Sequence, residues 1–221
     1  MDQLKTSSLL SLNETLAQEY LSQFEYPYEA LSGIKDYIIK KISFLNKDDY
    51  NIKGDIAIAK SAKIHPSAVI NGPAIIGLDT EIRPNAFIRG SVIIGSNCVI
   101  GNSCEFKNVI IFNNAQIPHF NYVGDSIIGY QSHLSAGVIT SNLKSDKTNI
   151  NIKINDEIIN TNLRKMGAIV GDNVEVGCNS VLNPGTIIGK NTSIYPLSSV
   201  RGYISENSIY KDKDNVVQKE S

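Results

Sequence analysis

Residues 58–106 read IAKSAKIHPSAVINGPAIIGLDTEIRPNAFIRGSVIIGSNCVIGNSCEF, and every sixth residue of this stretch is apolar. The apolar positions are Ile58, Ile64, Ile70, Ile76, Ile82, Ile88, Ile94, Ile100 and Phe106. Because 42% of the chain is apolar, chance produces such a run on the order of four times in ten thousand. The sixfold repeat is therefore a property of the fold.

Other residues follow the same period. Small side chains stand two positions before the apolar column, at Ala62, Ala68, Ala74, Thr80, Ala86, Val92, Cys98 and Cys104. Glycine or asparagine follows it at Asn71, Gly77, Gly95 and Gly101, where we expect corners with a positive φ angle. The phase slips near residues 110 and 128, and the pattern resumes from Val170 to Val200. Both arrays therefore belong to one solenoid.

A sixfold apolar column matches neither the alternation of a single strand nor the 3.6-residue period of an α-helix. It is typical of short strands joined by tight corners into a coil, with parallel strands of successive coils about 4.8 Å apart. The pattern predicts a mainly β protein, a parallel β-helix of hexapeptide repeats. The period alone leaves the handedness of the coil open.

The regions outside the repeat have different patterns. Residues 1–50 are predicted to form a helical cap, with a capping box at Ser11 and Glu14, a helix over 12–24 and a second helix from Ala30 to about Phe44. Residues 51–204 form the β-helix, and residues 205–221 a C-terminal tail.

A loop inserted at residues 143–165 interrupts the repeat. It alternates at Ile150, Ile152 and Ile154, has a turn at Asn155-Asp156, and continues with Ile158 and Ile159. This pattern predicts a hairpin that projects from the solenoid and marks a binding face.

Composition excludes several classes of protein. The chain has 221 residues, a net charge of −1, and 21 Lys plus Arg against 22 Asp plus Glu, which is no footprint for nucleic acid. It has no apolar run long enough to cross a membrane and no basic-then-apolar leader, so we expect a cytoplasmic protein without a membrane partner. Its three cysteines form no C-x-x-C pair, and we expect buried thiols rather than disulfides or zinc.

Arg89 and Lys107 each follow an apolar column residue and are eighteen residues apart. If three strands make one coil, the two cations lie side by side on neighbouring coils. They are either a solvated surface pair or the two arms of a phosphate-binding site.

His119, in the motif IPHFNYVGD, is either a corner histidine bonded to the backbone or a general base suited to neutral pH. His65 and His133 fit structural or solvent-facing roles better. The spacing of His119 and His133 does not suit a three-histidine zinc site, so we predict no metal site. Asn142 and Tyr122 are either corner residues or polar contacts for sugar hydroxyls.

At these motifs the chain resembles a known family. The repeat is similar to that of the left-handed β-helix acyltransferases. The segments KNVIIFNNAQIPHFNYVGDSIIG, LSAGVITSN and RKMGAIVGDNVEVGCNSVLNPGTIIG resemble the acetyltransferase domain of bifunctional glucosamine-1-phosphate N-acetyltransferase/N-acetylglucosamine-1-phosphate uridylyltransferases, in their archaeal-type versions. The resemblance covers about residues 56–204 and implies a left-handed coil.

The resemblance also implies roles for residues. His119 matches the catalytic base, Arg89 and Lys107 match the sugar-phosphate cations, and Tyr122 and Asn142 match the sugar contacts. The acetyl-coenzyme A wall matches Ala136, Cys178 and the region near Pro196. A lysine that usually follows the asparagine by six residues is Thr148 here, next to Lys147, which leaves the choice of amino sugar open.

The implied reaction is acetyl transfer from acetyl-coenzyme A to the amine of glucosamine 1-phosphate or galactosamine 1-phosphate, in UDP-N-acetylglucosamine biosynthesis. It requires no metal, and the family forms homotrimers with active sites between subunits. Residues 1–50 match no uridylyltransferase domain, so we expect no such activity. The alternatives are an acyltransferase for a nucleotide-linked amino sugar and a noncatalytic β-helix with an assembly or regulatory role.

Overall fold

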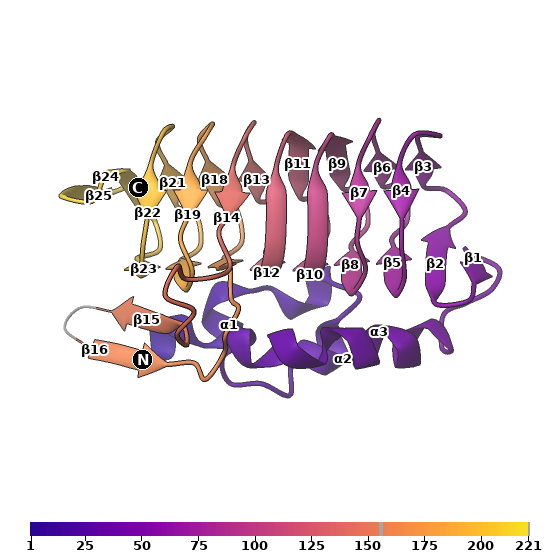
Figure 1. The fold of residues 1–221 in the computed structure, drawn as a ribbon, viewed down its shortest axis with the longest axis horizontal. Helices are drawn as coiled ribbons and strands as arrows, with labels where there is room; N and C mark the ends of the chain where they lie inside the picture. Colours follow the sequence, from indigo (N-terminus) through magenta and orange to yellow (C-terminus); the bar gives the residue numbers. More distant parts are fainter. Residues whose placement is uncertain (155–156, 221) are drawn as a thin grey trace.

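The computed structural model describes residues 1–154 and 157–220, and most of these form a triangular coil of short parallel strands (Figure 1). Successive coils are in register eighteen residues apart along the first part of the chain, as in the pairing of Ile70 with Ile88 and of Ile88 with Phe106. The predicted fold class, a left-handed parallel β-helix of hexapeptide repeats with a short N-terminal α-helical segment, is confirmed.

The coil has three faces, each a ladder of strands. The first face contains β4 (Val69–Ile70), β7 (Phe87–Ile88), the start of β10 (Glu105–Ile111), the start of β12 (Tyr122–Ile128), β14 (Ile139–Thr140), β19 (Val181–Leu182) and β22 (Ser199–Val200). The second face contains β2 (Ile56–Ala59), β5 (Ala74–Ile76), β8 (Val92–Ile94), the ends of β10 and β12, β17 (Ala168–Val170), β20 (Thr186–Ile188) and β23 (Tyr203–Ile204), and β1 (Tyr50–Lys53) pairs antiparallel with β2. The third face contains β3 (Lys63–Ile64), β6 (Glu81–Ile82), β9 (Val99–Asn102), β11 (Gln116–His119), β13 (His133–Leu134), β18 (Glu175–Val176), β21 (Ser193–Ile194), β24 (Ser208–Asp212) and the antiparallel β25 (Asn215–Gln218).

The apolar column forms the interior of the coil. Ile76, Ile94 and Phe106 are fully buried there, together with Cys98 and Cys104, which are 1% exposed. Each fully buried isoleucine contributes about 1.5–3 kcal/mol to stability. The packing role predicted for Cys98 and Cys104 is confirmed.

The prediction for the corner residues is wrong in position. The positive φ angles fall three residues after the apolar column, at Asp79, Asn85, Asn97 and their equivalents, and not at the residue that follows it. Gly77 and Gly95 are small for another reason, since a Cβ on Gly77 would lie 2.5 Å from the backbone of Gly95 on the next coil. These glycines permit close stacking of coils.

A second hydrophobic core lies outside the second face. In six successive strands of this face, from β5 to β20, one isoleucine points outward and is fully buried: Ile75, Ile93, Ile110, Ile127, Ile169 and Ile187. The N-terminal segment covers these residues along the length of the coil (Figure 1). Its elements are η1 (Asp2–Leu4), α1 (Thr6–Leu9), η2 (Leu12–Glu14), α2 (Gln18–Leu21), η3 (Pro27–Gly33) and α3 (Ile34–Ile42). Residues 1–50 therefore form a layer along a face, with Ile34 and Ile38 fully buried against it.

The first predicted helix is wrong in extent and in its cap. Residues 12–24 contain only the short η2 and α2, and Ser11 makes no capping bond. Instead the Ser11 hydroxyl and amide both donate to the Asp172 carboxylate, at 2.7 and 2.8 Å. The Ser11 hydroxyl, which a capping box requires, is therefore bonded to Asp172 and not to the helix. The second predicted helix is confirmed as η3 and α3, which together span 27–42.

The inserted loop forms the predicted antiparallel pair, β15 (Asn151–Ile154) and β16 (Glu157–Asn160), and the turn predicted at 155–156 lies outside the described residues. The pair does not project from the solenoid. Ile150, Ile152 and Ile154 are buried in the second core, on the same side of the coil as the helices (Figure 1). Gly185 permits this contact, because a Cβ there would lie 2.8 Å from Ile150.

Asp172 fastens the N-terminal layer to the coil. Its side chain is 2% exposed and accepts hydrogen bonds from Ser11, from the Tyr130 amide at 2.9 Å and from Lys190 Nζ at 3.1 Å. Removing a buried carboxylate leaves each of these donors without its partner.

We therefore expect Asp172→Ala to lower the free energy of unfolding by about 3 kcal/mol, because it breaks a buried ion pair and its hydrogen bonds. Urea unfolding measures this value, and Asp214→Ala, whose side chain is 82% exposed, is the control. Equal stability of the two variants would contradict the fastening role.

Candidate functional site

The two predicted cations lie side by side on the first face. Ile88 pairs with Phe106, and the Arg89 amide donates to the Phe106 carbonyl at 2.8 Å, which places Arg89 beside Lys107 on the next coil. Arg89 is not free, because its Nη1 atom lies 2.5 Å from Glu105 Oε1, a contact that raises the pKa of the guanidinium. No ion pair of Lys107 is found among residues 1–154 and 157–220. Lys107 is therefore the cation available to an anion without displacing a carboxylate.

Tyr122 and Asn142 extend the same edge over the next coils. Tyr122 pairs with Glu105 on one side and with Ile139 on the other, and Asn142 follows β14 where the chain enters the insertion. Asn142 Nδ2 lies 3.2 Å from the Tyr122 hydroxyl. The four predicted substrate contacts, Arg89, Lys107, Tyr122 and Asn142, thus lie along one edge of the first face.

The phenol of Tyr122 lies over Gly124, which is in register with Lys107. Burial is the largest effect on Tyr122 and raises the pKa of its phenol; the hydrogen bond from Asn142 lowers this pKa by a smaller amount, and the charges of Asp125 and Glu105 raise it again. The phenol therefore keeps its proton at neutral pH and can donate a hydrogen bond.

Two further residues of this edge, Asp125 and Asn108, were not predicted from the sequence. Asp125 Oδ2 accepts from Asn142 Nδ2 at 2.5 Å, and Asp125 Oδ1 accepts from Asn108 Nδ2 at 2.9 Å. Both residues have positive φ angles, 48° for Asp125 and 54° for Asn108. The phase slip of the repeat could have indicated these two corners, because coils in this region pair residues seventeen apart, such as Lys107 with Gly124.

His119 lies at the other edge of the first face. It ends β11 on the third face, its side chain is exposed, and Tyr122 opens β12 three residues later. Its imidazole makes no hydrogen bond within the described part of the chain, and its amide donates to Asn121 Oδ1 at 3.1 Å. A single chain therefore does not bring His119 together with Arg89 and Lys107.

The three predicted cofactor contacts lie in one column with His119. Gly137 donates its amide to the His119 carbonyl at 3.0 Å, Asn179 to Ala136 at 2.8 Å, and Leu197 to Cys178 at 2.9 Å. The column therefore runs His119, Ala136, Cys178, Pro196 over successive coils. The prediction of a buried thiol is wrong for Cys178, which is exposed because it occupies this outer corner.

Large apolar side chains border this column. Phe120 and Leu197 occupy corners with φ angles of 53° and 61° and are 60% and 80% exposed. Asparagine or glycine suits this backbone conformation better, as at Gly137 and Asn179 between them. The column thus has an exposed apolar border.

The other two histidines make local contacts. His65 Nδ1 lies 2.9 Å from the Ser67 hydroxyl, and His133 Nδ1 lies 2.9 Å from Glu175 Oε2 on the third face. No group of three His, Cys, Asp or Glu side chains suited to a metal ion occurs among the described residues. No helix in the described ranges has both the length and the apolar character needed to span a membrane.

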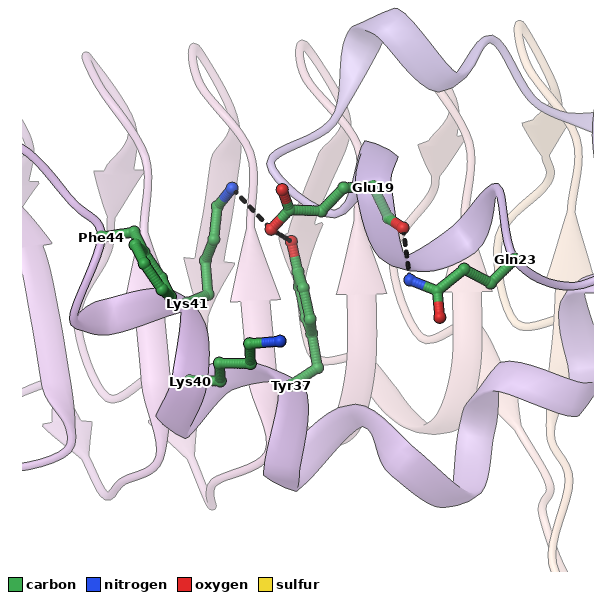
Figure 2. A pocket seen from close by; sticks show the side chains of 6 residues that line it. All are labelled: Glu19, Gln23, Tyr37, Lys40, Lys41 and Phe44. Carbon is green, nitrogen blue, oxygen red and sulfur yellow. Dashed lines mark hydrogen bonds and ion pairs between the residues drawn. The ribbon is translucent and has the colours of Figure 1, made fainter.

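A hollow in the helical layer contains polar groups that bind one another. Figure 2 shows Lys41 and Tyr37 converging on the Glu19 carboxylate, at 3.1 and 3.3 Å, while Gln23 donates to the Glu19 backbone carbonyl. Burial and the Glu19 charge raise the pKa of Tyr37. Because these groups satisfy each other, the hollow is a structural feature of the layer.

Two family models match the chain. Residues 70–163 match the GMPPB C-terminal domain, and residues 167–202 match the bacterial transferase hexapeptide, six repeats. Together with the relatives below, these matches confirm the resemblance to hexapeptide-repeat acyltransferases of the bifunctional type.

The chain is similar in sequence to curated bifunctional proteins. It is 43% identical over 201 residues to the bifunctional protein GlmU of Methanococcus maripaludis strain C7, covering 90% of this chain and 49% of that protein. It is 34% identical over 102 residues, 46% of this chain and 25% of the relative, to a bifunctional sugar-1-phosphate nucleotidylyltransferase/acetyltransferase of Sulfurisphaera tokodaii. The chain spans about half the length of the first of these relatives and a quarter of the second.

Among solved structures, the chain is similar to AntD, an N-acyltransferase from Bacillus cereus in complex with dTDP and 3-hydroxybutyryl-CoA. The identity is 18%, the match covers 77% of this chain and 82% of that one, and the TM-score is 0.41. At this level the similarity carries no functional information.

The burial of the cysteines predicts their reactivity. Burial raises the pKa of Cys98 to about 12 and also raises the pKa of Cys104, whereas Cys178 is exposed. We expect an aromatic disulfide reagent to titrate one thiol in the native protein and three after denaturation, and none in native Cys178→Ser. Rapid reaction of a second native thiol would contradict the burial of Cys98 or Cys104.

Proposed function

We propose that the chain catalyses acetyl transfer from acetyl-coenzyme A to the 2-amino group of a hexosamine 1-phosphate, either glucosamine 1-phosphate or galactosamine 1-phosphate. The observation that carries this proposal is the column in which the exposed imidazole of His119 is followed by Ala136, Cys178 and Pro196. An exposed imidazole, suited to act as a general base, lies at the end of a surface bordered by the apolar Phe120 and Leu197, and such a border suits the pantetheine arm of the cofactor.

In this reaction His119 takes a proton from the amine as its nitrogen attacks the thioester carbon. A backbone N–H group stabilises the oxyanion of the tetrahedral intermediate. The carbon–sulfur bond then breaks, coenzyme A leaves as a thiolate that takes up a proton, and the N-acetyl sugar phosphate remains.

Lys107 and Arg89 bind the phosphate in this proposal. Lys107 supplies an ammonium group that pairs with no carboxylate of the described residues, and Arg89 supplies a guanidinium that must exchange or share Glu105. Phosphate binding at this edge orients the amine, which lowers the entropic part of the barrier.

The separation of His119 from Lys107 within one chain supports a site completed by a neighbouring copy. We propose a homotrimer in which the imidazole edge of one subunit faces the polar edge of the next. Exposed apolar side chains on the first face, Val69, Phe87 and Ile139, would be covered in such an assembly. We expect no uridylyl transfer from these 221 residues, because they contain neither of the common glycine-rich phosphate motifs.

The purified chain, acetyl-coenzyme A and a panel of acceptors test the proposal through release of free thiol. We expect turnover with glucosamine 1-phosphate or galactosamine 1-phosphate and little with the same sugars lacking phosphate, because Lys107 then has no anion to bind. Turnover confined to a nucleotide-linked amino sugar would move the protein to another substrate class. No turnover and no binding of coenzyme A would leave a noncatalytic β-helix.

His119→Ala is expected to lower kcat by about 10²–10⁴-fold while the circular dichroism spectrum and melting temperature stay as in the wild type, because the exposed imidazole contributes little to the fold. His133→Ala, on the third face, is the matched control and should keep its activity. Equal turnover of wild type and His119→Ala would rule out this mechanism.

A further inference from the structure

Asp125 connects the polar edge to the helical layer. Its side chain is buried, with the residue 6% exposed, and its two carboxylate oxygens accept from two different side-chain amides, those of Asn142 and Asn108. Asn108 Nδ2 also donates to the carbonyl of Leu31 in η3, at 3.0 Å. No ion pair involving Asp125 is found in the described ranges. Its contacts are therefore hydrogen bonds to neutral groups.

This arrangement leaves one orientation for the Asn142 amide. A carboxylate has no hydrogen to donate, so Asn142 must turn its NH₂ group, and not its oxygen, toward Asp125. The two hydrogens of that NH₂ group go to Asp125 Oδ2 and to the Tyr122 hydroxyl. Asn142 therefore has no donor left to offer a ligand.

The outward atom of Asn142 is its Oδ1 oxygen. It has no hydrogen-bond partner in the described parts of the chain, where every buried side-chain nitrogen or oxygen has one. Oδ1 must therefore be accessible to solvent. Asn142 Oδ1 can therefore accept a hydrogen bond from a ligand.

The Tyr122 hydroxyl has the complementary polarity. Since it accepts a hydrogen from Asn142, its own hydrogen is available to a ligand, and the phenol stays protonated at neutral pH. Gly124 leaves room for this pair, because a Cβ there would lie 2.6 Å from the Tyr122 oxygen and 2.9 Å from Asn142 Nδ2. An acceptor and a donor are thus held beside each other next to Lys107.

We propose that Asp125 is a positioning residue that sets the hydrogen-bond polarity of this edge, so that the bound sugar must present a hydroxyl or amine hydrogen to Asn142 Oδ1. The inference rests on the proposed function, which it deepens by adding a requirement on the acceptor. A sugar whose group at this place only accepts hydrogen bonds, such as an ether or a fluorine, finds no donor on Asn142 and binds weakly.

Asp125→Asn tests the role without a change of shape. The substituted amide has one oxygen and one NH₂ group, so it can accept from Asn142 or from Asn108 but not from both. Asparagine also tolerates the positive φ of 48° at this corner, so the variant should fold. Asp79→Asn is the matched control, at an exposed corner with a φ of 55°.

We expect Asp125→Asn to raise the KM for the sugar phosphate about tenfold and to leave the KM for acetyl-coenzyme A unchanged, because the proposed cofactor column lies at the other edge. Asp79→Asn should match the wild type in both constants. A purely structural loss would instead lower the melting temperature and affect both substrates.

The second variant is Asp125→Asn combined with Asn142→Asp, which exchanges the carboxylate and the amide. The substituted amide can then accept from Asn108 and donate to position 142, whose other oxygen faces the ligand as an acceptor. We expect the double variant to have a KM about fivefold lower than Asn142→Asp alone, in which two carboxylates meet. No improvement would overturn the inference.

Fluorinated acceptors give a readout of polarity. In competition binding, the wild type should bind one singly deoxyfluorinated hexosamine 1-phosphate about tenfold more weakly than the others, and Asp125→Asn should reduce this difference. Equal binding of all analogues by the wild type would overturn the positioning role while the proposed acetyl transfer stands. Absence of acetyl transfer to any sugar phosphate by the wild type would overturn both.

Discussion

Backbone hydrogen bonds between successive coils are the constraint on which this structure depends. The parallel strands of the coil bond to the coils before and after them, as when Arg89 donates to Phe106 and Gly77 donates to Ile94. A residue's neighbours are therefore set by its position in the period more than by its local sequence. The same register that stacks Ile76 on Ile94 inside the coil stacks Arg89 on Lys107 outside it.

The outward-pointing residue of each hexapeptide determines whether a face of the coil is covered by other elements or exposed to solvent. On the third face the outward residues are mostly polar, such as Lys63, Glu81 and Glu175, and this face needs no cover. On the second face they are isoleucine in six coils, with Ala57 and Tyr203 at the two ends of the face, and the helical layer and the insertion cover them. The first face mixes apolar and polar residues, and the candidate site lies along its edges. The same coil therefore supports two hydrophobic cores and the face that carries the candidate site.

The repeat made the coil, the stacking of Arg89 on Lys107 and the hairpin of the insertion predictable, because all three follow from periodicity. The same run also indicates a face that is buried on both sides, because an isoleucine directly precedes the column residue in the strands of the second face, as at Ile75 and Ile93. Other features depend on contacts between distant segments. Ser11 bonds to Asp172 and Asn108 to Leu31, and neither pairing leaves a trace in the local sequence. The exposure of Cys178 likewise depends on which corner its coil assigns to it.

The shortened corners at Asn108 and Asp125 have a consequence for how such a protein can vary. Two successive coils lose a residue at this edge, and in the next coil Ile128 and its partner Val170 are 42 residues apart because the chain leaves there for the insertion. The interior column continues through all three coils without a break. The irregularity is thus confined to this edge, and a chain with eighteen residues in every coil would keep its interior but lose the contacts among Tyr122, Asp125 and Asn142. The edge at which the repeat is irregular is thus the edge that carries these polar contacts.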